Sequence, residues 1–187
     1  METIATRFRA SARTTHNLWA VVTTAMLLAL NTVLTLFVRV QITPDIRISF
    51  GFLAIAMIGM LFGPVMGLTA GVLGDLIGMV VKPTGAYFPG YTLTALLVGL
   101  IFGLMLYRED RIGLVRCFVT MALIDLVLHL SLNTLWSVIL NGSAFWVILG
   151  QRAIKNLLSW PIDSLLLFGM AQVVRRILKQ LGKPLYL

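Results

Sequence analysis

The run FWVILGQRAIKNLLSWPIDSLLLFGMAQVVRRI, from Phe145 to Ile177, decides the fold, because it is long and apolar enough to cross a bilayer yet carries basic residues inside it. Within this run, the stretch Gln151–Asn156 contributes Arg152 and Lys155. Insertion scales put the cost of an Arg or Lys near the bilayer centre at roughly 2.5 to 3.5 kcal/mol. Two such cations predict a site in the interior of a helical bundle, where each meets a charged partner or an anionic ligand.

The composition is that of an integral membrane protein. Hydrophobic residues make up 59% of the 187 residues, charged residues 12%, and the mean hydropathy is +0.95. Because a spanning helix needs roughly 20 residues, there is room for about six helices and no separate soluble domain. We expect one transmembrane domain over residues 1–187, with a basic segment at 1–16, six helices over about 18–177 and a basic C-terminus. The first apolar run lacks a small-residue cleavage site, which favours an anchored helix over a removed signal peptide.

Six apolar segments can be drawn, at about residues 18–38, 49–62, 64–81, 91–107, 114–140 and 145–177. The second covers only roughly 20 Å of a hydrocarbon core about 30 Å thick, so it is expected to be tilted, re-entrant or tucked against its neighbours. A sharp turn is predicted at Phe62–Pro64, with proline at the first position of the third helix. The predicted fold is therefore an all-α, six-helix transmembrane bundle with a short, tilted second helix.

The distribution of Lys and Arg predicts the orientation in the cell membrane. Two cytoplasmic termini would leave only Arg39, Arg47 and Lys82 in the outer loops, an asymmetry that fits the positive-inside rule and a multi-pass chain. The net charge of +8 then reflects topology and contact with anionic lipid headgroups. Nucleic acid is not a predicted partner, because no basic patch interleaved with aromatic residues is present.

Small residues recur at four-residue spacing along several of these segments, which predicts close approach of helix backbones. The glycine rows are Gly59, Gly63, Gly67 and Gly71, then Gly74 and Gly78, and Gly99 and Gly103. Ala25 and Ala29 form a similar pair in the first apolar segment. From its spacing alone, this pair fits internal packing and a subunit contact equally well.

Two polar stripes at helical spacing are expected to face the protein interior, since lipid cannot solvate them. They comprise Asp125, His129, Asn133 and Trp136 in the fifth segment, and Arg152, Lys155, Asn156, Ser159 and Asp163 in the sixth. Asn31, Thr35 and Asp75 extend this lining to four helices.

Depth along the helices suggests what these charges do. Lys155 and Asp125 lie at similar depth, so Lys155 either neutralises Asp125 or Asp75 or contacts a ligand. Arg152 lies a turn shallower with no carboxylate at its level, which favours an anionic or polar planar ligand. His129 is expected to be a satisfied buried imidazole rather than a proton relay, and Asp163 to be structural.

Aromatic residues gather in the outer loops, where Tyr87, Phe88 and Tyr91 accompany several turn-forming residues. Together with Trp136 and Trp146, they serve either as anchors at the membrane interface or as stacking plates for a flat ligand.

Several chemistries are excluded by missing motifs. None of the lysines is followed by Ser or Thr, so the chain contains no phosphate-binding loop and cannot hydrolyse ATP by that route. Neither a His-Glu-x-x-His motif nor a Gly-x-Ser-x-Gly elbow is present. With two His and one Cys, we expect no metal, no cofactor and no enzymatic activity.

The ordered set of motifs resembles the substrate-binding S components of energy-coupling factor vitamin transporters, and more narrowly the folate-specific members. The resemblance spans about residues 19–176 and is carried by the short second helix, the Ala25/Ala29 pair, and the stretches Arg47–Leu53, Tyr87–Leu93, Leu132–Trp136 and Arg152–Leu157. It implies a transmembrane substrate-binding domain that binds folate in the outer half of the bundle.

The resemblance also implies partners and a mechanism. A transmembrane coupling subunit would dock on the Ala25/Ala29 face, two cytoplasmic ATPases would supply energy, and the domain would reorient in the membrane. Contacts with the pterin ring and the anionic tail of folate would come from Arg47, Phe88, Asn133, Thr134, Trp136, Arg152 and Lys155.

Three other functions remain open from the sequence. An S component for riboflavin or thiamine would share the fold but would not need several cations near an acidic tail. A small membrane enzyme acting on a lipid or isoprenoid phosphate is disfavoured by the lack of a paired-carboxylate metal motif. A purely structural subunit is disfavoured by the two inward polar stripes.

Overall fold

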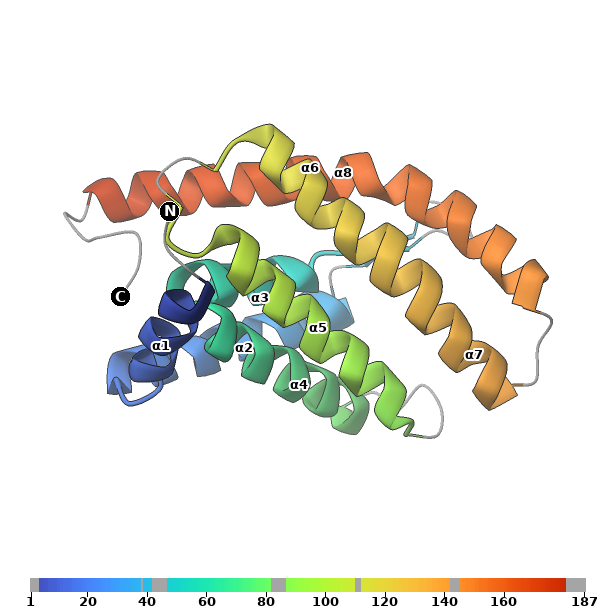
Figure 1. Cartoon of the computed structure of the whole chain (residues 1–187), viewed down its shortest axis with the longest axis horizontal. Helices are drawn as coiled ribbons and strands as arrows, with labels where there is room; N and C mark the ends of the chain where they lie inside the picture. Colours follow the sequence, from blue (N-terminus) through green and yellow to red (C-terminus); the bar gives the residue numbers. More distant parts are fainter. Residues whose placement is uncertain are drawn as a thin grey trace.

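The helices of the computed structural model run back and forth between two ends of an elongated bundle (Figure 1). Residues 4–37, 39–41, 47–81, 87–109, 112–141 and 145–180 are described, with the backbone alone at 39–41, 47–49, 141 and 147. We call the end that carries the first helix and the end of the last helix the terminal end. The opposite end, where the fifth and last helices begin, is the loop end.

In chain order the elements are α1 (Ile4–Thr14), α2 (Leu18–Phe37), β1 (Arg39–Gln41), β2 (Arg47–Ser49), α3 (Gly51–Phe62), α4 (Pro64–Val81), α5 (Pro89–Leu106), α6 (Leu114–Ala122), the π-helix η1 (Leu123–Leu132), α7 (Asn133–Asn141) and α8 (Phe145–Gln180). Because η1 joins α6 to α7 without a break, these three form one long rod beside α8 (Figure 1).

The predicted bundle is confirmed. Five helical stretches of the described chain are long and apolar enough to cross a membrane, and α3 is the short one, with 12 residues. Two features of the structure were not predicted from the sequence. The basic segment before the first span forms the helix α1, and β1 pairs antiparallel with β2, with Arg39 opposite Ser49.

Glycines allow α4 and α5 to pack closely, and this pair forms the most extensive helix contact in the described chain. A Cβ atom added at Gly67 would overlap the backbone of Gly99, and one added at Gly99 would overlap Gly67. A Cβ atom added at Gly59 would likewise lie only 2.8 Å from the backbone nitrogen of Gly103 in α5. The predicted close packing is therefore confirmed at these positions, whereas Gly78 has no atom within 4 Å of its ideal Cβ.

The turn between α3 and α4 is held by a residue from α1. Gly63 adopts a φ of 87°, which suits glycine, and α4 begins at Pro64 as predicted. The buried hydroxyl of Ser11 donates to the Phe62 carbonyl over 2.6 Å and accepts from the Val65 backbone N–H over 3.0 Å. Ser11 therefore satisfies free backbone groups at the end of one helix and the start of the next.

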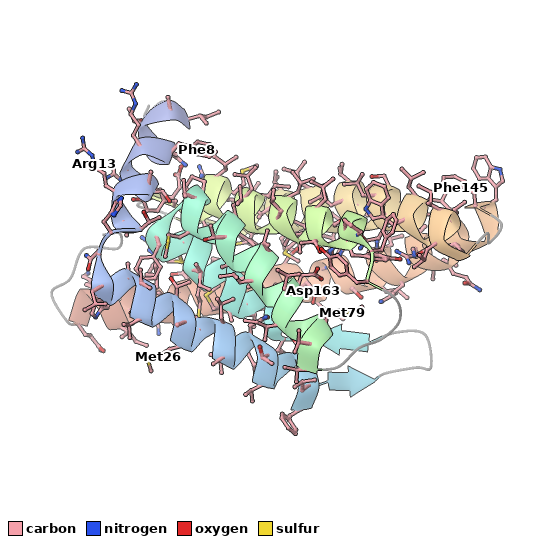
Figure 2. All side chains as sticks on the ribbon, turned by 90° about the horizontal axis from the view of Figure 1, so that it is seen from below. Phe8, Arg13, Met26, Met79, Phe145 and Asp163 are labelled. Carbon is pink, nitrogen blue, oxygen red and sulfur yellow. The ribbon has the colours of Figure 1, made fainter. Side chains whose placement is uncertain are left out.

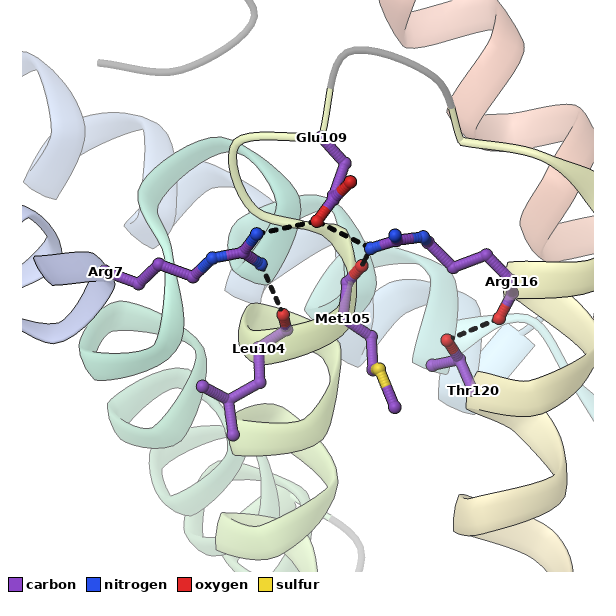
Figure 3. Close-up of polar contacts among 6 residues, drawn as sticks. All are labelled: Arg7, Leu104, Met105, Glu109, Arg116 and Thr120. Carbon is purple, nitrogen blue, oxygen red and sulfur yellow. Dashed lines mark hydrogen bonds and ion pairs between the residues drawn. The ribbon is translucent and has the colours of Figure 1, made fainter. Parts of the chain in front are cut away.

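An ionic cluster at the terminal end joins α1, α5 and α6 (Figure 3). Glu109 Oε1 lies 2.6 Å from Arg7 and 2.7 Å from Arg116. Each arginine also donates to a carbonyl at the end of α5, Arg7 to Leu104 and Arg116 to Met105. Burial alone would raise the pKa of the Glu109 carboxyl, but the hydrogen bonds and charges of the two arginines outweigh it and hold that pKa below its usual value.

Contacts from α8 hold it against the neighbouring rod. The Asn156 side chain donates to the Asp125 carbonyl in η1 over 2.8 Å, and the Trp160 indole donates to the Phe118 carbonyl in α6 over 2.9 Å. A side chain that bonds a helix carbonyl is a recognised cause of local departures from α-helical geometry. Such π-helical segments are rare and frequently mark functional sites.

Candidate ligand-binding site

Two cavities adjoin inside the bundle and share Phe52, Val98 and His129 as walls. The one nearer the loop end, the loop-side cavity, has a volume of about 320 Å³. It is lined by Asn31, Phe52, Ile55, Gly71, Gly74, Asp75, Tyr91, Thr94, Ala95, Val98, His129 and Asn133. Because Gly71, Gly74 and Ala95 carry little or no side chain, the α4–α5 backbones themselves form part of its wall.

The second cavity, the central cavity, has a volume of about 200 Å³. It is lined by Phe52, Val98, Phe102, Met121, Ile124, Asp125, His129, Lys155, Asn156, Ser159 and Asp163. Phe52 and Phe102 are stacked, with ring centroids 6.5 Å apart and planes 18° from parallel. Figure 2 places Asp163 between the two ends of the bundle. The lining of this cavity therefore combines aromatic and apolar side chains with charged ones.

Buried polar atoms on these walls lack hydrogen-bond partners among the described residues. They are Asp125 Oδ2, Asn133 Oδ1 and Ser159 Oγ. A buried polar atom without a partner costs about 1 to 3 kcal/mol, and more when it is charged. Such atoms on cavity walls are suited to receive the polar groups of a ligand.

Asp125 pairs with His129 rather than with Lys155. The His129 Nδ1 atom lies 3.3 Å from Asp125 Oδ1, one helical turn along η1. The described residues contain no ion pair of Lys155, which instead lines the central cavity. Of the two predicted roles for Lys155, neutralisation of Asp125 or Asp75 is therefore not observed.

Arg152 takes part in a hydrogen-bond chain toward the loop-side cavity. It donates to Ser137 Oγ over 2.6 Å, and that hydroxyl lies 3.1 Å from the Tyr91 hydroxyl. Tyr91 in turn lines the loop-side cavity. The described part of the chain provides no carboxylate partner for Arg152, so its guanidinium retains donors for an anion.

Aromatic rings cover the loop end of the α5–α7 contact. The Phe88 ring lies 5.6 Å from that of Trp136 and 6.1 Å from that of Tyr91. The Trp136 indole donates to Thr94 Oγ1 over 3.1 Å, and Gly90 leaves the space that the Phe88 and Trp136 rings occupy. Trp136 therefore packs within this wall, whereas Trp146, near the start of α8 at the same end of the bundle, is 78% exposed.

Asp75, which also lines the loop-side cavity, accepts a hydrogen bond from a residue of α5. The Thr92 hydroxyl donates to Asp75 Oδ2 over 2.7 Å, and Thr92 Oγ1 lies 3.1 Å from the Tyr87 hydroxyl. This carboxylate therefore already has a hydrogen-bond donor.

The residues predicted as a substrate site fall into four groups. Asn133 and Lys155 line the cavities. Arg152, Phe88 and Trp136 form the loop-end wall beside them, while Thr134 is fully buried and lines neither cavity. Arg47 begins β2, and its side chain lies outside the described part of the structure.

The predicted substrate site did not include the cavity-lining residues Phe52 and Thr94 or the Arg152 partner Ser137, and Tyr91 was considered only as one of the outer-loop aromatic residues. Phe52 and Tyr91 stand in the loop motifs quoted above, so those motifs carried a usable signal. Thr94 and Ser137 are short polar residues in apolar helices, a pattern too common to single out. No group of three metal-ligating side chains occurs among the described residues.

Comparison with known proteins identifies the family. The family described as "ECF transporter, substrate-specific component" matches residues 20–171. The chain belongs to this family. It is therefore the substrate-specific component of a transporter and a multi-pass membrane protein.

Individual relatives agree with this assignment. The chain is 37% identical over 153 residues to "Folate transporter FolT" of Clostridium novyi, which covers 82% of this chain and 88% of that protein. It is 32% identical over 145 residues to a protein of the same name from Leuconostoc mesenteroides, with coverage of 74% and 77%. A solved structure titled "Crystal structure of FolT bound with folic acid" superposes with a TM-score of 0.73 at 27% identity, over 83% of this chain and 94% of that one.

Proposed function

We propose that this substrate-specific component binds folate in the loop-side and central cavities. The observation that carries the proposal is the pair of adjoining cavities with shared walls, beside an arginine that has no carboxylate partner in the described part of the chain. Buried polar atoms without a partner among the described residues lie on the walls of both cavities. Their combined size lies within the roughly 300 to 1,000 Å³ of small-molecule sites. The similarity to proteins named folate transporters supports folate as the occupant.

Each predicted site residue has a proposed part in binding. Arg152 and Arg47 contact the two carboxylates of the glutamate tail, because a guanidinium binds carboxylates in a bidentate way. Phe88 and Trp136 close the loop end of the site around the ligand. Thr134 is 0% exposed and is proposed to position its neighbours.

Asn133 and Lys155 are proposed to contact the ligand from the walls. Asn133 Oδ1 lacks a partner in the loop-side cavity, and the Lys155 ammonium faces the central cavity without an ion pair in the described residues. Folate supplies both donors and acceptors to such groups.

The proposed transport assembly follows from the family. A transmembrane coupling subunit and two cytoplasmic ATPases provide the energy, and the single domain over residues 1–187 reorients in the membrane with both termini in the cytoplasm. Ala25 and Ala29 are exposed on α2, beside Met26, which projects away from the bundle (Figure 2). A surface of small residues allows another helix to approach closely, so this face is the proposed contact with the coupling subunit.

Calorimetric titration of the purified protein tests the proposal, with riboflavin and thiamine as control ligands. We expect tight folate binding and no heat from the controls. Arg152→Ala should weaken folate binding by about 2 kcal/mol or more, because it removes a charged contact in a desolvated site. The matched control is Arg13→Ala, an exposed arginine of α1 that projects away from the bundle (Figure 2). Absence of folate binding by a monodisperse sample would overturn the proposal.

A further inference from the structure

The helix α1 packs on the bundle through one face and leaves a basic face exposed. We propose that this exposed face, which carries Arg9 and Arg13, binds the headgroups of anionic lipids at the membrane surface. The site lies at the terminal end, outside the two cavities, and rests on the contacts of α1 rather than on the proposed folate function. It makes α1 an interfacial helix whose orientation is fixed by the bundle.

Spacing along α1 separates the two faces. Arg7, Ser11 and Thr14 lie four and three residues apart, which places them on one face of the helix. Ser11 and Thr14 are buried, while Arg7 and Ser11 make the bonds to the end of α5 and to the α3–α4 turn described above. Arg9 and Arg13 are four residues apart on the opposite face, and both are exposed. The contacts of the first face therefore determine the direction of the second.

The two exposed arginines are not neutralised by any described residue. No side-chain hydrogen bond or ion pair of Arg9 or Arg13 occurs in the described part of the chain. The carboxylate that the structure describes at this end belongs to Glu109, and it is already shared by Arg7 and Arg116. The guanidinium groups of Arg9 and Arg13 therefore retain their donors for an external anion.

The position of α1 relative to α2 places the basic face at the membrane surface. The spanning helix α2 starts with Leu18 and Trp19, which are 77% and 44% exposed, and Trp is enriched where hydrocarbon meets headgroups. Only residues 15–17 separate α1 from this boundary. In Figure 2, α1 is inclined steeply to the long axis of the bundle, with Phe8 on the side toward the bundle and Arg13 on the side away from it. This is the arrangement of a helix that lies in the interface with its basic face among the headgroups.

Position also distinguishes an anionic lipid from an acidic protein as the partner. Headgroups surround a spanning bundle at all times, so an acidic protein would first have to displace them from α1. In the proposed orientation the terminal end lies in the cytoplasmic leaflet, whose anionic lipids attract basic residues close to a spanning helix. Arg176 and Lys179, exposed at the end of α8, add to the positive charge of this end. The favoured partner is therefore an anionic lipid headgroup.

Native mass spectrometry of the full chain tests the inference, because it resolves each bound lipid and gives an apparent affinity for the first one. Phosphatidylglycerol is the anionic probe, and phosphatidylcholine with the same acyl chains is the zwitterionic control. A basic side chain near an anionic surface raises the affinity about fivefold, so Arg9→Ala combined with Arg13→Ala should weaken phosphatidylglycerol binding at least about tenfold. Phosphatidylcholine binding should change by less than about threefold, because this lipid carries no net charge.

Two further variants serve as controls. Arg9→Lys combined with Arg13→Lys keeps the charge and should retain phosphatidylglycerol binding within about threefold. Arg176→Ala combined with Lys179→Ala removes the same charge from the end of α8. The Gln172 side chain bonds the Ile112 carbonyl just before α6, so Arg176 and Lys179 lie about one and two turns beyond that level, farther from the hydrocarbon. This variant should therefore lose less than about threefold in affinity.

Several results would overturn the inference. Unchanged phosphatidylglycerol binding after loss of both α1 arginines is the first, provided that the variant has the wild-type Tm. Equal losses in the two double-alanine variants would show that net charge alone determines lipid binding. Loss of binding in the lysine variant would show that charge is not what the headgroup recognises. Normal lipid binding by the α1 double-alanine variant, together with loss of co-purification with a coupling subunit or ATPase, would assign this face to an acidic protein instead.

Discussion

Replacing Gly99 with alanine tests how far backbone contact between α4 and α5 determines stability. The added Cβ would overlap the Gly67 carbonyl oxygen. Rotation of a side chain cannot relieve this clash, because both atoms are held by the backbone. Overpacking destabilises a protein by up to about 3 kcal/mol, and the higher helix propensity of alanine relative to glycine offsets about 1 kcal/mol of this loss. The net loss is therefore about 2 kcal/mol, or about 4 to 8 °C in Tm for a chain of this size.

The matched control is Gly169→Ala in α8, where no atom lies within 4 Å of the ideal Cβ. This variant makes the same substitution in a helix without the clash, so its Tm should stay equal or rise by a few degrees. Thermal unfolding of both variants in one detergent, followed by fluorescence, gives the comparison. Equal Tm values for the two variants would refute the claim that the α4–α5 backbones are in contact.

Three further predictions concern the terminal end and the α2 surface. Because the Glu109 pKa is lowered in the folded state, its ion pairs should stabilise the protein above the ordinary pKa of 4.5 and lose that effect as the pH falls through the folded value. Glu109→Gln should therefore lower the free energy of unfolding by about 1 kcal/mol at neutral pH, after allowance for solvent screening. In acid, the Tm of the variant should approach that of the wild-type protein. A difference in Tm that stays constant across a pH series would contradict this. Ser11→Ala should lower the free energy of unfolding by about 1 to 2 kcal/mol in denaturant titrations, because it leaves the Phe62 carbonyl and a backbone N–H of α4 unpaired. Unchanged stability would show that Ser11 does not stabilise the turn between α3 and α4. Ala25→Leu combined with Ala29→Leu should leave folate affinity unchanged and prevent co-purification with a coupling subunit, and normal co-purification would argue for a different docking face.

Most of the bundle could be predicted from the sequence, because apolar length and glycine spacing act locally. The segment around residues 49–62 is too short to span, and the structure has a 12-residue helix there. The four-residue spacing of the glycine rows predicts close approach of helix backbones, and the structure has such an approach where a Cβ added at Gly67 would overlap Gly99. The length of a segment and the spacing of its glycines are local features, whereas the pairing of Gly67 with Gly99 is set by how the two helices pack.

The side-chain partners were harder to predict, because depth along a helix does not determine the direction in which a residue points. Lys155 and Asp125 lie at similar depth, yet Asp125 pairs with His129 in η1. The π-helical geometry of η1 alters which residues share a face of the helix. No residue type in Leu123–Leu132 indicates a π-helix rather than an α-helix. The contact of Arg152 with Ser137 likewise depends on how α8 is rotated against α7.

The most direct test of the account is an experimental structure of the folate complex in lipid nanodiscs. The account predicts ligand density in the loop-side and central cavities, with the glutamate tail toward Arg152. Folate bound outside both cavities, or a glutamate tail without contact to Arg152, would contradict the proposed site.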